Sequence, residues 1–434
     1  MPIHLDTEQP DFSARFTAFL GSKRESAVDV QQQVGAIIAD VRARGDKALV
    51  ELSRTFDRVD LDALGLRVSE AELDAALASI DPKTRAALEF AKGRIESHHA
   101  RQKPTDDRYT DAAGVELGHR WTAVDAVGLY VPGGTAAYPS TVLMNAVPAK
   151  VAGVQRMVMV VPAPDGRIAP LVLAAARLAG VDEIYRVGGA QAVAALAYGT
   201  ETIRPVDKIV GPGNAYVAQA KRQVFGQVGI DMVAGPSEVL IMADEDANAD
   251  WIAADLLAQA EHDKAAQSIL VSDSADLLAR VEQAVESMLA TLPRTEIASA
   301  SWRDHGALIK VRTFNEAPDL VNRIAPEHLE IETADAEAMV ERIRHAGAIF
   351  IGRYTPEAIG DYVGGSNHVL PTARSARFSS GLSVLDFMKR TSILKLTADA
   401  LEKLGPAAVC LAGVEGLDAH GRSVSIRTNA GEGV

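Results

Sequence analysis

Short apolar runs alternate with helical stretches from Trp121 onward, and this order constrains the fold more than any other feature of the sequence. Strands that alternate with helices along a chain form mainly parallel sheets that helices cover. The strand candidates are residues 157–161, 183–187 and 208–210, and the helix candidates are residues 170–178, 190–198 and a segment from about Asn214. The sequence therefore predicts a first α/β domain over residues 120–237.

The same alternation restarts at Glu238, so we expect a second α/β domain over residues 238–380. The boundary is expected near Ala234-Gly235-Pro236, because glycine and proline interrupt both helices and strands. The strand candidates of this domain are residues 239–242, 269–271, 307–311, 329–332 and 348–351, and its helix candidates are residues 248–262 and 274–289.

Residues 1–119 are predicted to form a helical region that packs on the α/β domains, with helical apolar spacing over Ser26–Phe56. Ser69 and Glu72 have the spacing of a capping box, which would open a further helix. That helix runs toward His98 and His99, which we interpret as solvated charges at a helix C-terminus.

Residues 381–434 are expected to form a small tail unit, with a strand over residues 393–396 and helices after Thr397. The predicted fold class is α/β, with two Rossmann-like parallel-sheet domains, a helical N-terminal region and this tail.

The chain has 434 residues, a formal charge of −14 and a pI of about 5.2. An acidic chain lacks the basic face of a nucleic-acid-binding protein or of a polybasic membrane anchor, so both classes are disfavoured. The single cysteine, Cys410, lies in an apolar run and is predicted to be a small buried hydrophobe. With no secretory signal and no apolar run of bilayer length, a cytoplasmic protein is expected.

Glu327 and His328 stand side by side just after Pro326, in the segment Asn322–Glu330. Because proline fits neither a helix interior nor a strand ladder, the pair is expected at the end of an element. Histidine is the side chain whose pKa lies closest to neutral pH, and a neighbouring glutamate can activate water. In an arbitrary sequence, however, such a pair is most often a solvated surface pair.

Gln259 and His262 are three residues apart on the predicted helix 248–262, so they share one face. Histidine nitrogen and side-chain oxygen are zinc ligands. From the residues alone Glu261 or Asp263 is as plausible a ligand as the glutamine, and a histidine that pairs with the helix C-terminus remains an alternative.

Two further segments carry acids and histidines. Residues 360–372 form a glycine-rich, polar stretch that contains Asp361 and His368, and glycine lets a backbone approach a ligand closely. Residues 415–420 contain Glu415, Asp418 and His420, although in isolation this stretch is an ordinary turn between helices.

Three glycine-rich turns follow strand candidates of the first α/β domain, at Tyr130–Thr135, Val187–Gln191 and Val210–Ala215. The last two open helices, whose free N–H groups can bind phosphate. Neither matches the dinucleotide fingerprint, since Tyr216 stands where the third glycine would follow Gly211 and Gly213. The turns permit a dinucleotide without requiring one.

Taken together, these segments resemble the histidinol dehydrogenase family over essentially the whole chain. The most specific segments are Asn322–Glu330, Gly211–Asn214, Ala234–Glu238, Gln259–His262, Asp361–Pro371 and Glu415–His420, in this family's order. The resemblance implies the NAD-dependent oxidation of L-histidinol to L-histidine through the aldehyde, with two NAD reduced and one bound zinc ion. It also implies a homodimer whose C-terminal segment crosses to the partner.

The resemblance also assigns roles to individual residues. It implies that Glu327 and His328 are the acid–base pair and that zinc is held by Gln259, His262, Asp361 and His420. The substrate would contact Ser237, His368 and Glu415, together with His328 and the four zinc ligands. The NAD contacts would be Tyr130, Gln191 and Asn214.

Three other functions remain open at this point. An enzyme of the same fold could oxidise another alcohol, in which case His368 and Glu415 are the positions that would differ. A zinc-dependent hydrolase could use Glu327 to activate water, but it would leave the glycine turns without a role. A catalytically silent metal-binding protein would not need the full set of candidate residues.

Overall fold

A computed structural model of the chain describes residues 1–21, 29–133, 138–233 and 235–428. The chain forms two compact units. The first comprises Met1–Gln102 and Asp125–Phe387, and the second comprises Lys103–Val124 and Met388–Val434. The boundaries of these two units differ from the boundaries of the four segments expected from the sequence. Gly134, Thr135 and Ala234, which belong to the predicted motifs, lie outside the described residues. No described helix is long and apolar enough to cross a membrane.

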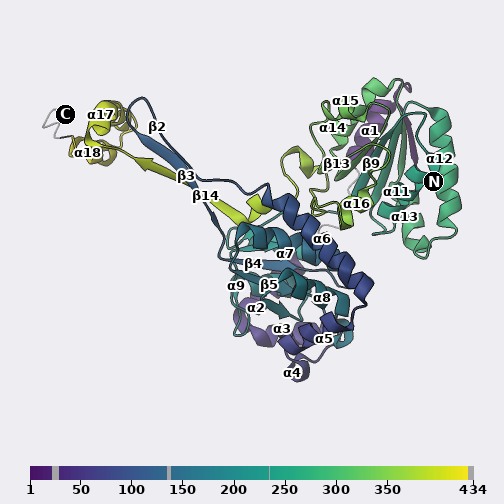
Figure 1. Cartoon of the computed structure of the whole chain (residues 1–434), viewed down its shortest axis with the longest axis horizontal. Helices are drawn as coiled ribbons and strands as arrows, with labels where there is room; N and C mark the ends of the chain where they lie inside the picture. Colours follow the sequence, from purple (N-terminus) through teal and green to yellow (C-terminus); the bar gives the residue numbers. More distant parts are fainter. Residues whose placement is uncertain (22–28, 134–137, 234, 429–434) are drawn as a thin grey trace. The chain divides into compact units, whose positions relative to one another are not determined.

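The first sheet of unit 1 is parallel, with strand order β6-β5-β4-β7-β8, as the alternating pattern predicts. Helices cover both of its faces (Figure 1). The strands are β4 (Ala126–Tyr130), β5 (Arg156–Val160), β6 (Glu183–Tyr185), β7 (Lys208–Val210) and β8 (Gly229–Ile230). The helices between them are α7 (Pro139–Ala152), α8 (Pro170–Ala179), α9 (Gly189–Tyr198) and α10 (Ala215–Val224), with a 3-10 turn at Pro164–Gly166.

The second sheet of unit 1 is also parallel, with strand order β1-β11-β10-β9-β12-β13. Its strands are β1 (Ile3–Asp6), β9 (Glu238–Ala243), β10 (Gln267–Ser272), β11 (Ala307–Lys310), β12 (His328–Glu332) and β13 (Ala348–Ile351). Its helices are α1 (Phe12–Gly21), α11 (Ala249–Ala260), α12 (Ala275–Leu289), α13 (Thr295–His305), α14 (Ala317–Ile324), α15 (Ala336–Val340) and α16 (Glu357–Tyr362). Further 3-10 turns are Phe314–Glu316, Ser375–Arg377 and Val384–Phe387. These elements confirm the predicted α/β fold class.

The N-terminal region contributes a strand that its sequence did not predict. Residues Ile3–Asp6 pair in parallel with β11, which lies some three hundred residues later in the chain. Helix α1 follows, and its Phe16 and Phe19 are buried in the core of the second sheet. The first residues therefore belong to the second sheet rather than to a separate helical region.

The predicted N-terminal helices are each broken into shorter ones. The stretch up to Phe56 divides into α2 (Asp29–Arg44) and α3 (Asp46–Phe56) at Gly45, whose φ of 55° favours glycine. After α4 (Leu61–Leu64), the capping box of Ser69 is confirmed at the start of α5 (Glu70–Ser79). A new helix, α6 (Pro82–Ala100), then begins because proline suits the first helical position.

His99 lies on the buried face of α6, and its Nδ1 is 2.8 Å from the carbonyl oxygen of Ile95. Burial lowers the pKa of its imidazole. The expectation of a solvated charge is therefore correct for the exposed His98 and wrong for His99.

The second unit contains an antiparallel sheet of order β14-β3-β2 and two helices. Its elements are β2 (Asp107–Thr110), β3 (Glu116–Ala123), β14 (Met388–Lys395), α17 (Ala398–Val414) and α18 (Asp418–Ser425). Helix α17 begins after Thr397 as expected, and Thr397 caps it. Cys410 on that helix is exposed, so its predicted burial is wrong.

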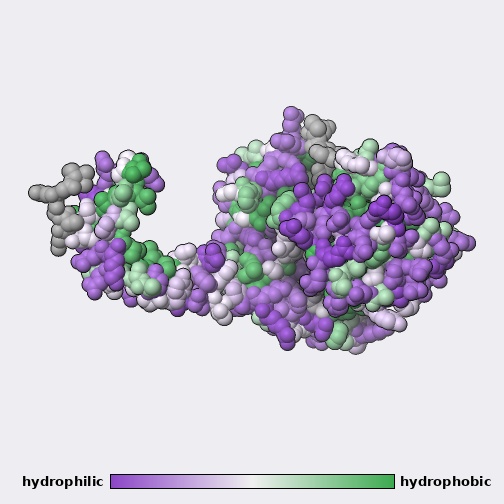
Figure 2. All heavy atoms as spheres, turned by 90° about the horizontal axis from the view of Figure 1, so that it is seen from above, coloured by the Kyte–Doolittle hydropathy of each residue, from purple (hydrophilic) through white to green (hydrophobic). Residues whose placement is uncertain are grey.

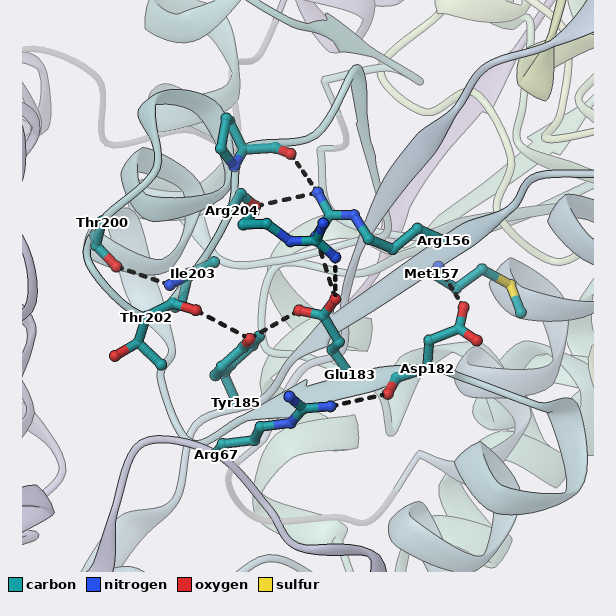
Figure 3. Close-up of polar contacts among 11 residues, drawn as sticks. Arg67, Arg156, Met157, Asp182, Glu183, Tyr185, Thr200, Thr202, Ile203 and Arg204 are labelled. Carbon is teal, nitrogen blue, oxygen red and sulfur yellow. Dashed lines mark hydrogen bonds and ion pairs between the residues drawn. The ribbon is translucent and has the colours of Figure 1, made fainter.

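A buried carboxylate, that of Glu183, organises the amino edge of the first sheet (Figure 3). The Tyr185 hydroxyl donates to it at 2.8 Å, while Arg204 and Arg156 approach it at 3.1 and 3.5 Å. Burial tends to raise the pKa of Glu183, but these partners outweigh it and hold the pKa below the ordinary value. The network ties the loop that precedes β7 to β5 and β6.

Candidate functional site

Glu327 and His328 lie at the amino edge of the second sheet, where α14 gives way to β12. Ala325 ends α14 with a φ of 51°, and Pro326 separates it from the strand. The side chains are buried, with Glu327 only 5% and His328 only 4% exposed. A solvated surface pair is therefore excluded, and the pair lies at the end of an element as Pro326 indicates.

Three carboxylates surround the imidazole of His328. Its Nδ1 is 3.0 Å from the carbonyl oxygen of Glu238 and 3.7 and 3.9 Å from carboxylate oxygens of Glu327 and Glu357. Its Nε2 is 3.5 Å from Asp361 Oδ1 and has no hydrogen bond among the described residues. In the neutral form of the imidazole, a proton on Nδ1 that is donated to the Glu238 carbonyl leaves the lone pair of Nε2 free to accept another.

Burial and charge act in opposite directions on this pair. Burial would lower the pKa of His328, but Glu357, Glu327 and Asp361 outweigh it and raise the pKa well above the ordinary value. Burial raises the pKa of Glu327 to about 8, even though its Oε2 accepts a 2.8 Å hydrogen bond from the backbone N–H of Glu238. Both groups are therefore desolvated and have pKa values above their ordinary ones, a setting that suits acid–base catalysis.

Gln259 occupies the last turn of α11 and is fully buried. When its amide nitrogen faces Glu357 and its oxygen faces the backbone N–H of Glu238, both contacts are hydrogen bonds of 2.7 Å. Glu357, the first residue of α16, thus belongs to the same cluster. No sequence pattern identified Glu357 as a site residue, because a glutamate after a proline indicates only a helix start.

Asp361 and His368 complete the group that unit 1 brings together. Burial tends to raise the pKa of Asp361, but the imidazole of His328 outweighs it and lowers the pKa. His368 Nδ1 is 3.0 Å from the Asp361 carbonyl oxygen, and its Nε2 is 3.4 Å from Thr141 Oγ1. Burial lowers the pKa of His368.

His262 and Ser237 lie at the margin of this group. The backbone N–H of His262 donates to the Gln259 carbonyl at 3.1 Å, just past the end of α11. Part of this residue is exposed to solvent, and desolvation of the remainder lowers the pKa of its imidazole, which favours the neutral form. Ser237 is half-buried and immediately precedes Glu238 in the strand beside His328.

Two predicted residues are not part of this group. Glu415 and His420 belong to the second unit, where both are exposed. The structure also gathers acids that were not predicted: ligand atoms of Asp255, Glu330 and Glu332 lie within 4.8 Å of one another. Burial raises the pKa of Asp255 to about 6 and that of Glu332 to about 7, so partial protonation relieves their repulsion.

The predicted NAD contacts lie at the carboxyl edge of the first sheet. Tyr130 ends β4, and its hydroxyl accepts a 3.0 Å hydrogen bond from the backbone N–H of Gly189 at the start of α9. Gln191 is buried in the first turn of α9. Asn214 is exposed and caps α10, since its Oδ1 accepts from Tyr216 and Val217 at 3.1 and 3.2 Å.

A buried ion pair fixes the turn that begins at Gly211. Lys221 pairs with Asp231 and donates to the Gly211 carbonyl at 2.9 Å, while Asp231 accepts from the Gly211 N–H at 2.8 Å. A Cβ at Gly211 would lie 2.1 Å from the carbonyl oxygen of Tyr130, so only glycine allows this close approach.

Comparisons with known proteins show which family the chain resembles. Residues 21–428 match the family described as histidinol dehydrogenase. A histidinol dehydrogenase of Brucella abortus (strain 2308) is 70% identical over 429 residues, covering 99% of this chain and 100% of the relative. That of Bradyrhizobium diazoefficiens is 68% identical with the same coverage. The crystal structure of histidinol dehydrogenase from Elizabethkingia anophelis has a TM-score of 0.94 at 36% identity, covering 99% of this chain and 98% of that one.

Proposed function

Because the chain belongs to the histidinol dehydrogenase family and is therefore an NAD-dependent oxidoreductase of histidine biosynthesis, we propose that the site around His328 oxidises L-histidinol to L-histidine. The reaction would pass through L-histidinal and reduce two NAD. The observation that carries this assignment is the buried cluster in which Glu327, Glu357 and Asp361 surround His328.

We propose that one zinc ion is held by Gln259, His262 and Asp361, with His420 as the fourth ligand. The donors fit: the lowered pKa of His262 favours a neutral imidazole, the low pKa of Asp361 keeps it ionised, and the Gln259 amide is buried. When bound, zinc would supply a Lewis-acidic anchor that orients the imidazole and amine of histidinol. Binding of Asp361 to a cation would also remove one of the charges that raise the pKa of His328.

In the first oxidation, His328 would accept the hydroxyl proton at Nε2 while hydride leaves the substrate carbon for NAD. Nε2 suits this role because it has no hydrogen bond among the described residues, and the Glu238 carbonyl holds the proton of Nδ1. In the second oxidation, His328 would take the proton of the aldehyde hydrate in the same way.

Glu327 would activate the water that hydrates the aldehyde between the two oxidations. Its carboxyl is buried beside His328 and held by the backbone of Glu238, so it is fixed where the aldehyde is formed. Ser237, His368 and Glu415 would contact the substrate. The aldehyde is expected to stay bound between the steps, since a buried site keeps a reactive intermediate from side reactions.

Tyr130, Gln191 and Asn214 are proposed to contact NAD at the carboxyl edge of the first sheet, the edge where open α/β sheets bind ligands. This proposal is supported by the turn at Gly211, whose backbone Lys221 and Asp231 hold in place. We propose a cytoplasmic location, which suits a chain whose only cysteine has no partner for an intramolecular disulfide.

We further propose a homodimer in which Glu415 and His420 complete the partner's site. Figure 2 shows apolar side chains on the surface of the second unit. Leu394, Leu411, Val414 and Ile426 are between 63% and 82% exposed there. Clustered exposed apolar residues are typical of a surface that another chain covers.

The decisive experiment is to count the NADH formed, by absorbance, from limiting L-histidinol and zinc-loaded protein. Two NADH per histidinol, abolished by a chelator and restored by zinc, are expected. One NADH would indicate an alcohol dehydrogenase that stops at the aldehyde. No NADH from a zinc-loaded protein would reject histidinol as the substrate.

Replacing His262 by asparagine is expected to remove bound zinc and activity together, because an imidazole suits zinc whereas an amide is a much weaker ligand. Metal content after gel filtration and the rate of NADH formation check this. His4→Asn is the matched control, because the His4 side chain is exposed and its ring lies beside Glu282 on the second sheet, outside the proposed site. Stoichiometric zinc in His262→Asn would rule out the ligand assignment.

A further inference from the structure

The buried carboxylate of Glu357 contacts two residues to which the proposed reaction assigns roles, although Glu357 itself has none so far. It is 2% exposed and begins α16, the helix that also carries Asp361. Its own backbone N–H donates to Glu330 Oε1 at 2.6 Å. Both the backbone and the side chain of Glu357 are therefore held in place before any ligand binds.

The two carboxylate oxygens of Glu357 face different partners. When the amide nitrogen of Gln259 faces Glu357, Oε1 accepts a hydrogen bond of 2.7 Å from it. Oε2 lies 3.9 Å from His328 Nδ1 and has no hydrogen bond among the described residues. In this orientation the Glu357 carboxylate faces the NH2 end of the Gln259 amide, and the backbone N–H of Glu238 faces its oxygen.

This orientation matters because the two ends of an amide are different chemically. A glutamine can ligate a cation only through its oxygen, since its nitrogen carries two protons and is a donor. A neutral amide buried without a fixed partner could turn either end toward the ligand site. An acceptor that binds the NH2 group leaves the oxygen on the opposite side, free to exchange its present hydrogen bond for a metal ion.

We propose that Glu357 is a positioning residue, which holds the NH2 group of Gln259 so that the amide oxygen is presented to the metal. This inference rests on the proposed zinc site. It explains how glutamine, an unusual zinc ligand, can serve here in place of the more common carboxylate or imidazole.

Two replacement side chains of similar length distinguish the effect of the hydrogen bond from the effect of the charge. Glu357→Gln keeps an acceptor oxygen, whereas Glu357→Met keeps only the size. We expect Glu357→Met to weaken zinc binding by about tenfold or more and Glu357→Gln to stay within about threefold of the unsubstituted protein. Zinc affinity is measured by competition with a chromophoric chelator. The sample is the folded full-length protein in the oligomeric state in which it is purified.

A cycle with Gln259→Ala tests whether Glu357 acts through Gln259. In that background, Glu357→Met is expected to cause no further loss of zinc affinity, because the amide that it positions is gone. A purely structural role would lower stability in both backgrounds and leave the zinc affinity of the folded protein unchanged.

The cobalt-loaded protein gives a second readout, which also serves if Glu357→Met does not fold. Glu357→Asp withdraws the acceptor by one methylene, so the visible absorption of bound Co2+ is expected to change as the amide oxygen leaves its position. An unchanged spectrum in Glu357→Asp, or unchanged zinc affinity in Glu357→Met, overturns the inference. Equal losses in Glu357→Gln and Glu357→Met overturn the hydrogen bond as its cause. If the unsubstituted protein binds no stoichiometric zinc, the zinc site itself is wrong.

Discussion

Replacing His328 by asparagine is expected to slow both oxidation steps by about a thousandfold, within the range for loss of a general base. The same Nε2 would accept a proton in each step, and the imidazole of His328 is the one that Glu327, Glu357 and Asp361 surround. Asparagine preserves a polar side chain near the Glu238 carbonyl but offers no basic nitrogen. Single-turnover NADH formation is measured separately from L-histidinol and from L-histidinal.

Zinc content must be measured on the same preparation, because His328 lies 3.5 Å from the proposed ligand Asp361. Retained zinc with loss of both steps supports the role of a base. If either substrate is oxidised at an undiminished rate, His328 is not the base for that step. His368→Asn is a useful comparison, because His368 contacts the backbone of Asp361 but is expected to bind substrate rather than to accept its proton.

The order of strands and helices was predictable because each element carries its own local signal. Apolar runs and helical spacing predicted the elements of the second sheet, including helices near residues 248–262 and 274–289, and the structure shows that Asn248 and Ser274 cap them. The pairing of β1 with β11 was not predictable, because a four-residue strand has no local mark of a partner some three hundred residues away. The breaks at Gly45 and Pro82 were readable in principle from glycine and proline, but helical spacing on both sides concealed them.

The site was predictable only where its residues are adjacent or share a recognisable motif. Glu327 and His328 could be selected together because they are neighbours, and Asp361 because it lies in a glycine-rich segment. Glu357 could not, because its meaning depends on the packing of α16 against α11, which no local pattern encodes. The position of the pair in the sheet was also unexpected. Glu327 and His328 lie at the amino ends of the strands, whereas open α/β sheets usually bind ligands at the carboxyl ends.

Glu327→Gln is expected to separate the two halves of the reaction. Oxidation of L-histidinol to L-histidinal should continue, since Glu327 has no part in removing the hydroxyl proton. Oxidation of the aldehyde to the acid should fall by about a hundredfold or more, because a neutral amide cannot take a proton from water. One NADH per histidinol in a single turnover, instead of two, is the expected signature.

The pH dependence of the second half follows from the same carboxyl group. Burial raises the pKa of Glu327 to about 8, so the ionised form, which is the base, increases as the pH rises toward that value. A bound cation nearby would lower the pKa, so the rate of aldehyde oxidation should rise with an inflection at or below pH 8. Glu327→Gln should abolish this inflection. Equal loss of both halves in this variant, or an inflection that survives the substitution, would assign the activation of water to another group.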